Sequence, residues 1–247
     1  TACPMLAQAA WQHWSIPQRA VPKMLVVQDS MAHAATELGI IKNRWVVKGL
    51  HLFERWAFQA FDLHSTISKN MRERVLEISG GRIPCRVTPN WIHGSLATLI
   101  AGRRSRLGGN KNQRSISGGL FYSGNFGVKQ GLPQFLALME KARGRWKMAI
   151  HGGGAEAEAL RQAASSRNNW LTVGGLLKET DYVDRLISVG ACVVTQMPGV
   201  GASFLPSKLL PALATGAPVL ALCEQDSPLG IEVRDGRFGV VIEPGDA

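Results

Sequence analysis

Residues 122–129 (YSGNFGVK) combine two glycines with a lysine, which is the composition of a phosphate-binding loop. Gly124 and Gly127 permit close approach to the backbone. Lys129 supplies a positive point charge for a phosphate. The segment follows an apolar run and precedes a helical one, so it predicts a ligand loop between a strand and a helix. An ordinary turn with one surface lysine is the alternative.

Two later loops have the same character. Residues 151–154 (HGGG) leave room for a base or sugar against bare backbone, and they open a helix whose free N–H groups favour an anion. Farther on, Pro206 fixes the approach to Ser207, which is predicted to cap the next helix. A diphosphate there would meet N–H groups, the serine hydroxyl and the Lys208 ammonium together. Each loop alone fits a structural turn or cap, but the three together predict a nucleoside-diphosphate site.

Other chemistries have little support in the sequence. No cluster of His, Cys and carboxylates has metal-site spacing, and no G-x-S-x-G nucleophile motif occurs. The four cysteines are scattered without a C-x-x-C pair, which argues against zinc or disulfides and predicts a cytoplasmic setting. They are Cys3, Cys85, Cys192 and Cys223.

The predicted loops need strands and helices to position them. Ligands in doubly wound sheets bind beyond the carboxyl ends of the strands, where the loops meet helix N-termini. Apolar runs predict strands at 116–122, 146–151, 171–173, 192–196, 218–222 and 239–242. Helical periodicity predicts helices near 131–142, 155–165, 180–189, 207–215 and 228–234. This alternation predicts a complete parallel-sheet domain over residues 116–247.

The first part of the chain predicts a smaller α/β unit. Strands are expected at 23–28, 64–67 and 85–88, with helices at 43–61 and 68–78. In the longer helix, Val47, Leu50, Phe53 and Ala57 form the expected buried stripe. Three strands make a small parallel sheet, so we expect its opening strands to be missing.

The fold class predicted is therefore α/β, with two Rossmann-like doubly wound domains of which the first is incomplete. Residues 93–115 are rich in Gly, Ser, Arg and Asn and are interpreted as the connection between domains 1–92 and 116–247.

Charge is distributed unevenly between the two parts. Residues 1–115 contain 16 Lys and Arg against 6 Asp and Glu, whereas the two kinds balance at 12 each in residues 116–247. Such asymmetry predicts an anionic neighbour, either nucleic acid or a membrane surface, with a solvated basic face as the alternative. The basic part lacks an aromatic-interleaved patch or a known nucleic-acid module, which favours the membrane.

Together these motifs resemble the group 1 (family 4) glycosyltransferases, which have the GT-B fold. The resemblance rests on Y-S-G-N-F-G-V-K-Q-G-L, H-G-G-G, V-G-G-L-L and F-L-P-S-K-L-L-P-A-L-A-T-G-A-P-V in that order. The P-S-K before L-A-x-G-x-P-V is similar to the colanic-acid-type exopolysaccharide enzymes. V-V-Q-D, L-F-E-R-W-A-F, S-T-I-S-K-N-M-R-E-R-V and V-T-P-N-W agree in the first part, so the resemblance covers nearly the whole chain.

The resemblance implies a retaining enzyme that transfers sugar from a UDP- or GDP-sugar and needs no metal or other cofactor. Lys129 and Ser207-Lys208 would hold the donor diphosphate, and the backbone around 174–177 would recognise the base. The full set implied for the donor site is Gly124, Asn125, Lys129, Gly153, Gly154, Gly174, Leu176, Leu177, Pro206, Ser207 and Lys208. Gln28 and Asp29 match the acceptor-side loop and are the implied catalytic-side residues.

The implied partners are a nucleotide-sugar and a lipid-linked or oligosaccharide acceptor in exopolysaccharide or cell-envelope biosynthesis. Peripheral attachment to the inner face of the membrane is expected from the basic first part together with its tryptophans, which are Trp11, Trp14, Trp45 and Trp56. The resemblance also implies that strands before Thr1 and helices after Ala247 complete the fold. We therefore expect this chain alone to bind donor but to transfer sugar poorly.

The sequence also departs from the family pattern. Ser203 and Pro211 stand where many relatives carry an E-x7-E pair, and Asn125 stands where an Arg often holds phosphate. Residues 31–33 replace the common W-P-D. Two alternatives remain open: a GT-B sugar-nucleotide epimerase, and a degenerate donor-binding protein without catalysis.

Overall fold

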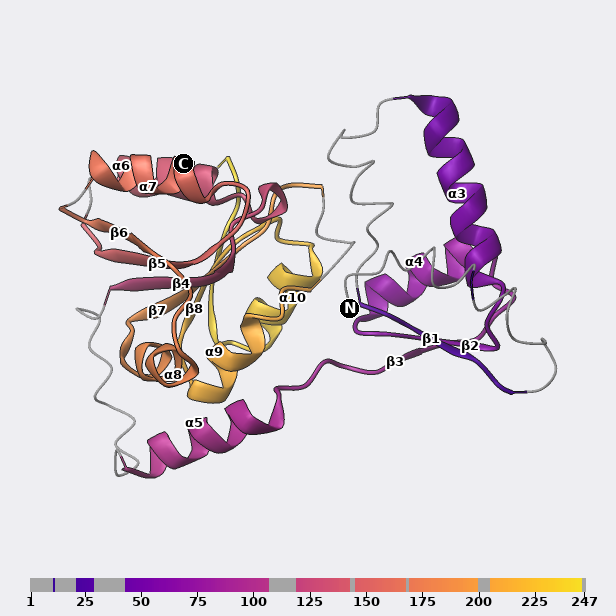
Figure 1. The fold of residues 1–247 in the computed structure, drawn as a ribbon, viewed down its shortest axis with the longest axis horizontal. Coiled ribbons are helices and arrows are strands. Elements are labelled where there is room, and N and C mark those ends of the chain that lie inside the picture. Colours follow the sequence, from indigo (N-terminus) through magenta and orange to yellow (C-terminus); the bar gives the residue numbers. More distant parts are fainter. Residues whose placement is uncertain are drawn as a thin grey trace. The chain divides into compact units, whose positions relative to one another are not determined.

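The computed structural model describes residues 11, 21–28, 43–106, 119–142, 145–167, 169–199 and 205–245. Their contacts divide the chain into two units, with the boundary between Asn90 and Trp91 and with Leu205 grouped with the first unit. Each unit contains its own parallel sheet flanked by helices (Figure 1). The predicted α/β class, with two parallel sheets, is confirmed.

The first unit has a three-stranded sheet in the order β1-β2-β3. The strands are β1 (Met24–Val27), β2 (Leu63–Thr66) and β3 (Cys85–Val87), and the helices between them are α3 (Arg44–Phe58) and α4 (Lys69–Ser79). Each helix begins at a capping side chain. Asn43 Oδ1 accepts a hydrogen bond from Trp45 N at 3.0 Å, and Ser68 Oγ accepts one from Met71 N at 3.2 Å.

The buried face of α3 differs from the predicted stripe. Ala57 lies in the core as expected, but Glu54 and Phe58 share that face, whereas Phe53 is 41% exposed. Apolar residues occur on both sides of this helix, so periodicity alone does not identify the buried side. The exposed side carries a run of large apolar side chains, namely Trp45, Val46, Leu52, Phe53 and Trp56.

The second unit has a six-stranded sheet in the order β6-β5-β4-β7-β8-β9, with every neighbouring pair parallel. The strands are β4 (Leu120–Asn125), β5 (Met148–Gly153), β6 (Leu171–Gly174), β7 (Ala191–Thr195), β8 (Val219–Leu222) and β9 (Gly239–Ile242). Their positions agree closely with the predicted ones. Residues 116–118 of the first predicted strand lie outside the described residues.

Helices cover both faces of this sheet. They are α6 (Leu132–Lys141), α7 (Ala157–Ser165), α8 (Glu179–Ser188), α9 (Leu209–Thr215) and α10 (Pro228–Asp235). Helices α6 and α7 lie on one face, and α8 and α9 lie on the other (Figure 1). The chain builds β4, β5 and β6 outward in one direction and then returns to place β7 on the other side of β4. The boundary between β4 and β7 is therefore the point where strand order reverses.

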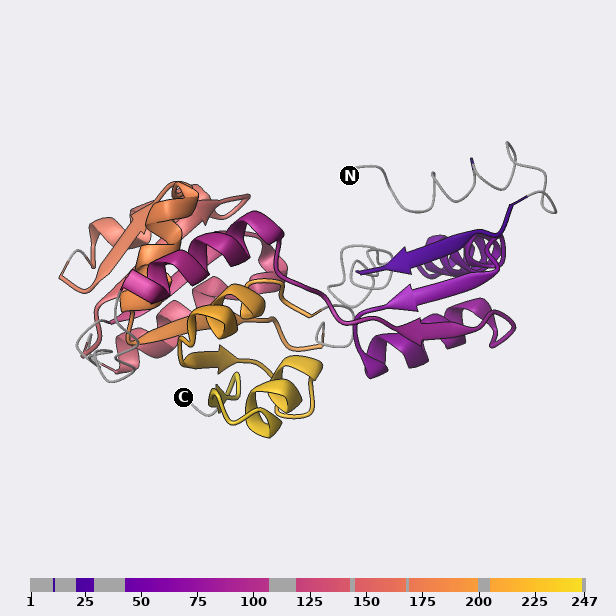
Figure 2. The ribbon, with the colours of Figure 1, turned by 90° about the horizontal axis from the view of Figure 1, so that it is seen from below.

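The segment interpreted as an interdomain connection is largely helical. Helix α5 (Gly94–Arg106) packs against α8 and α9 of the second unit (Figure 2). Arg103 Nε lies 3.0 Å from Asp184 Oδ1, and Arg104 Nη1 donates to the carbonyl of Ala214 at 3.0 Å. Two of the arginines in the segment interpreted as a connection thus bind α8 and the last turn of α9. Residues 107–115 lie outside the described part of the chain.

Candidate functional site

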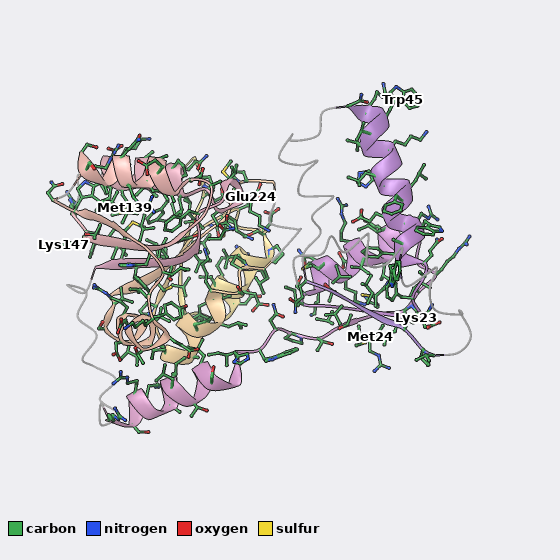
Figure 3. The ribbon with its side chains drawn as sticks, viewed as in Figure 1. Lys23, Met24, Trp45, Met139, Lys147 and Glu224 are labelled. Carbon is green, nitrogen blue, oxygen red and sulfur yellow. The ribbon has the colours of Figure 1, made fainter. Side chains whose placement is uncertain are left out.

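The carboxyl ends of the six parallel strands lie together on one side of the second sheet, which we call its carboxyl edge, and the amino ends lie at the opposite edge. Figure 3 labels residues near both edges: Glu224 follows β8, and Lys147 precedes β5. In doubly wound sheets ligands bind at the carboxyl edge, where strand order reverses. Here that place is the pair of adjacent strands β4 and β7, with the loop of β5 beside them.

Tyr122 organises the carboxyl end of β4. Its side chain is fully buried, and its Oη donates to the carbonyl of Asn125 at 2.7 Å. The pKa of Tyr122 is raised by burial and, less strongly, by the nearby Glu156 carboxylate. The phenol therefore stays protonated, and its single hydrogen is committed to the strand's own backbone.

Lys208 lies directly on this tyrosine. Its Nζ is 2.6 Å from Tyr122 Oη and 3.8 Å from the centre of the ring. Burial lowers the pKa of Lys208 to about 7. Gly124 is adjacent, since a Cβ at that position would lie 3.4 Å from Lys208 Nζ. The structure thus brings together Gly124 and Lys208, which are 84 positions apart in the sequence and belong to separate loops.

The three glycines after His151 have different roles. Gly152 has φ +153°, and a Cβ there would collide with the carbonyl oxygen of Gly124. Gly154 has φ +146°, and its Cβ would lie 2.7 Å from the carbonyl oxygen of Phe126. Of these three glycines, only Gly153 faces open space, since a Cβ at this position would have no atom within 4 Å. Two glycines therefore permit close packing of β4 and β5, and one leaves the backbone accessible.

Gly174 is the last residue of β6, and it packs against His151 of β5. A Cβ on Gly174 would lie 2.5 Å from His151 Cε1. His151 Nδ1 lies 3.2 Å from the carbonyl oxygen of Gly175, which accepts its hydrogen when that nitrogen is protonated. Leu176 is 84% exposed and Leu177 is partly buried. His151 is accordingly a packing residue that fixes the loop predicted to recognise the base.

The capping role predicted for Ser207 is wrong. Helix α9 begins at Leu209, and its N-cap is Lys208, whose side chain makes no capping hydrogen bond. Pro206 and Ser207 instead form a turn, in which the carbonyl of Ser207 accepts from Leu210 N at 3.2 Å. Ser207 is exposed, so its hydroxyl remains at the surface of the site.

Lys129 is on the short 3-10 helix η3 (Val128–Gln130) that follows β4. Its backbone carbonyl accepts from Met197 N at 3.0 Å, which joins the loop of β4 to the loop of β7. The Lys129 side chain is partly buried. The structure therefore places Lys129 in the pair of loops at the reversal point.

Sequence reasoning missed several polar groups at this edge. Within the described chain, Gln130 Oε1, Thr195 Oγ1 and Glu156 Oε2 are buried and have no hydrogen-bond partner. Burial raises the pKa of Glu156. Tyr122 was also missed, because it was quoted only as the first residue of the 122–129 loop and was given no role. Its position two residues before the glycine of the loop was the available signal.

The residues predicted for the acceptor side, Gln28 and Asp29, belong to the first unit. Gln28 follows β1, and its Nε2 donates to Asn90 Oδ1 at 3.3 Å. Asp29 lies outside the described residues. The part of the chain that the structure describes contains no group of three His, Cys, Asp or Glu side chains arranged to hold a metal. In the same residues no helix is long and apolar enough to cross a membrane.

Two cavities lie at the opposite edge of the second sheet. One, of about 310 Å³, is lined by Lys147, Trp170 and Arg185. The other, of about 430 Å³, is lined by apolar residues that include Met139 and Trp146. Both adjoin the amino ends of the strands, and the first also reaches along β5 to His151.

The six-stranded parallel sheet, with its strand order reversed at β4 and β7, has the arrangement of one Rossmann-like half of a GT-B fold. Sucrose-phosphate synthase from Thermosynechococcus elongatus matches 96% of this chain and 58% of its own, with a TM-score of 0.65 and 17% identity. Anabaena HepE, solved with UDP and with UDP-glucose, matches 98% of this chain and 63% of its own, with a TM-score of 0.64 and 14% identity. These matches show the GT-B fold.

Sequence comparison gives a more particular relative. The chain is 29% identical over 236 residues to WcaI of Escherichia coli K12, which is named as a colanic acid biosynthesis glycosyl transferase. The match covers 90% of this chain and 56% of WcaI, so the chain spans about half the length of that relative. No protein-family model matches the chain.

The glycine geometry leads to a prediction about stability. Gly152→Ala should lower the free energy of unfolding by roughly 2–5 kcal/mol, because it strains a left-handed residue and drives a methyl group into the Gly124 carbonyl. Gly153→Ala is the matched control and should change stability by less than about 1 kcal/mol. Urea unfolding followed by circular dichroism measures both. Equal destabilisation by the two substitutions would contradict the division of roles.

Proposed function

We propose that the chain is the donor-binding half, with part of the acceptor-binding half, of a retaining glycosyltransferase that uses a UDP- or GDP-sugar. The observation that carries the proposal is the edge of the second sheet where Lys208 lies against Tyr122 and Gly124. Lys129 lies on the neighbouring loop, and Gly153 presents open backbone. The similarity to WcaI and the UDP complexes of HepE support this assignment.

The proposed reaction replaces the bond between the sugar's anomeric carbon and the donor diphosphate with a bond from that carbon to an acceptor hydroxyl oxygen, whose proton passes to the leaving diphosphate. Negative charge then develops on the leaving diphosphate, and preorganised positive groups lower the energy of that transition state. We assign this role to Lys129 and Lys208, so that the proposed reaction proceeds without a metal ion. Gln28 and Asp29, after β1, are proposed to contact the acceptor.

The proposed acceptor is a lipid-linked or oligosaccharide substrate of exopolysaccharide or cell-envelope biosynthesis, which the name of WcaI supports. We propose a cytoplasmic protein bound to the inner face of the membrane through helix α3. The exposed side of α3 carries Trp45, which is 74% exposed, and Trp56, whose ring stacks on Phe53 at 5.6 Å between centroids. Arg44 and Lys48 belong to the same helix. Aromatic rings beside basic residues are typical of helices at an anionic membrane interface.

Product analysis separates this function from its alternatives. Incubation with UDP- and GDP-sugars and a lipid-linked acceptor gives a glycosylated lipid from a transferase. A free, stereochemically altered sugar nucleotide is the product of an epimerase, and bound but unchanged donor indicates a binding protein. Pro211 stands at the position of the family's ribose-binding glutamate, and the loss of that glutamate favours the alternative of a non-catalytic donor-binding protein.

The donor-site assignment predicts the effect of removing each lysine. A charge-assisted contact is worth about 1.5–3 kcal/mol, so Lys129→Ala and Lys208→Ala should each weaken UDP or GDP binding by roughly tenfold to a hundredfold. Lys147→Ala, at the opposite edge of the sheet (Figure 3), is the control and should leave affinity unchanged. Isothermal titration calorimetry of the 247-residue chain measures all three. Wild-type affinity in both donor-site variants would disprove the assignment.

The membrane proposal predicts binding to vesicles that contain phosphatidylglycerol. Each basic residue near an anionic leaflet contributes about 1 kcal/mol, so binding should weaken as salt is raised. Trp45→Ala with Trp56→Ala should reduce co-sedimentation by about tenfold or more. Trp146→Ala, a comparably exposed tryptophan at 42% against 41% for Trp56, should not. Binding that is indifferent to lipid charge, salt and both α3 tryptophans would reject the proposal.

A further inference from the structure

The contact between Lys208 and Tyr122 has a specific hydrogen-bond polarity. The Tyr122 hydroxyl has one hydrogen, which it donates to the carbonyl of Asn125 at 2.7 Å. Its oxygen lone pairs are therefore the groups that face Lys208 Nζ at 2.6 Å. The ring adds an aromatic face 3.8 Å from the same nitrogen. Both contacts favour the charged amine over the neutral one.

No carboxylate shares this contact in the described chain. Lys208 has no salt bridge there, and the charged or titratable groups near the pair are Glu156 at the start of α7 and Cys192 on β7. The ammonium is thus held by a neutral oxygen and a ring. Two of its three N–H groups remain for another acceptor.

We propose that Tyr122 is a positioning residue for Lys208. The tyrosine holds the amine at the end of β4 and keeps it able to take up a proton when a nucleoside diphosphate binds. The inference rests on the proposed donor site. It adds a residue that touches no substrate, and it makes donor affinity depend on pH.

The direction of the pH effect follows from linkage. Without ligand, burial lowers the pKa of Lys208 to about 7, so the amine loses its proton as pH rises from 6 to 8. A bound diphosphate raises that pKa by opposite charge. The contribution of Lys208 to affinity is therefore greatest at pH 6, and it falls about tenfold between pH 6 and pH 8. Calorimetry in two buffers with different ionisation enthalpies should detect uptake of close to one proton at pH 8 and almost none at pH 6.

Tyr122→Phe tests the positioning role while keeping the ring and the burial. Loss of the acceptor oxygen lowers the pKa of Lys208 further. UDP affinity should then fall by about fivefold or more at pH 8 and change little at pH 6, with the midpoint of proton uptake moved to lower pH. A loss caused only by disturbed packing would weaken binding equally at both pH values, and that result would overturn the proposal.

Three controls identify the titrating group. Lys208→Met should bind weakly with no proton uptake attributable to the protein, and Lys208→Arg should give affinity whose pH dependence is only that of the ligand's own phosphate. Glu156→Gln should leave the wild-type midpoint in place. A midpoint that moves in Glu156→Gln instead would assign the effect to the carboxylate and refute the inference.

A ligand-free measurement separates this inference from the proposed function. The rate at which acetic anhydride labels Lys208 can be followed by mass spectrometry from pH 6 to 10, with Lys147 as an internal reference. Tyr122→Phe should move the Lys208 midpoint to lower pH, and thermal unfolding checks that the variant is folded. An unmoved midpoint rejects the positioning role even if UDP binds. Absence of UDP and GDP binding to wild type rejects the donor site alone.

Discussion

The structure of the second unit depends on how closely β4 approaches β5. The two strands stay paired to their ends, with Gly124 opposite Gly152 and Asn125 opposite Gly153. A side chain at Gly152 would collide with the backbone of β4. Because β4 is also the strand where the order reverses, this close pairing determines where the loops of β4, β5 and β7 meet. The hydrophobic core below it, with Tyr122, Phe126 and Ile150 fully or almost fully buried, holds β4 in that position.

Much of this arrangement was predictable from periodicity. The strands of the second sheet are short apolar runs separated by helical segments, and parallel strands with crossover helices place all carboxyl ends at one edge. That rule alone brings residues near 124, 129, 153 and 208 to the same side of the sheet. The rule predicts that these residues lie on the same side of the sheet, but it does not predict which side chains touch. The Lys208–Tyr122 hydrogen bond depends on the exact turn at Pro206 and Ser207, which no local propensity specifies.

The remaining errors share a physical cause, which is that tertiary packing overrides local pattern. Ser207 has the chemistry of a cap, yet the first turn of α9 starts one residue later than capping requires. The segment that contains α5 has the composition of a loop, but Arg103 and Arg104 find partners on α8 and α9 and the helix forms against them. In α3 both sides are apolar, so only the position of the sheet decides that Phe58 is buried and Phe53 is exposed.

A half-buried lysine with no carboxylate partner among the described residues reduces the stability of the fold unless a ligand compensates it. The pKa of Lys208 is 10.5 when unperturbed and about 7 in the folded chain. Between those pH values the unfolded chain binds more protons, so this residue destabilises the fold increasingly as pH falls from 10.5 to 7, and the cost is then constant below 7. A buried charge is tolerated when a counter-charge and hydrogen bonds accompany it. Among the described residues, the contacts given to this amine are the Tyr122 oxygen and ring, and a diphosphate would supply the counter-charge. In the proposed donor site, binding and folding would be coupled through the same nitrogen, because the amine that lowers the stability of the unliganded sheet is also the group assigned to the diphosphate.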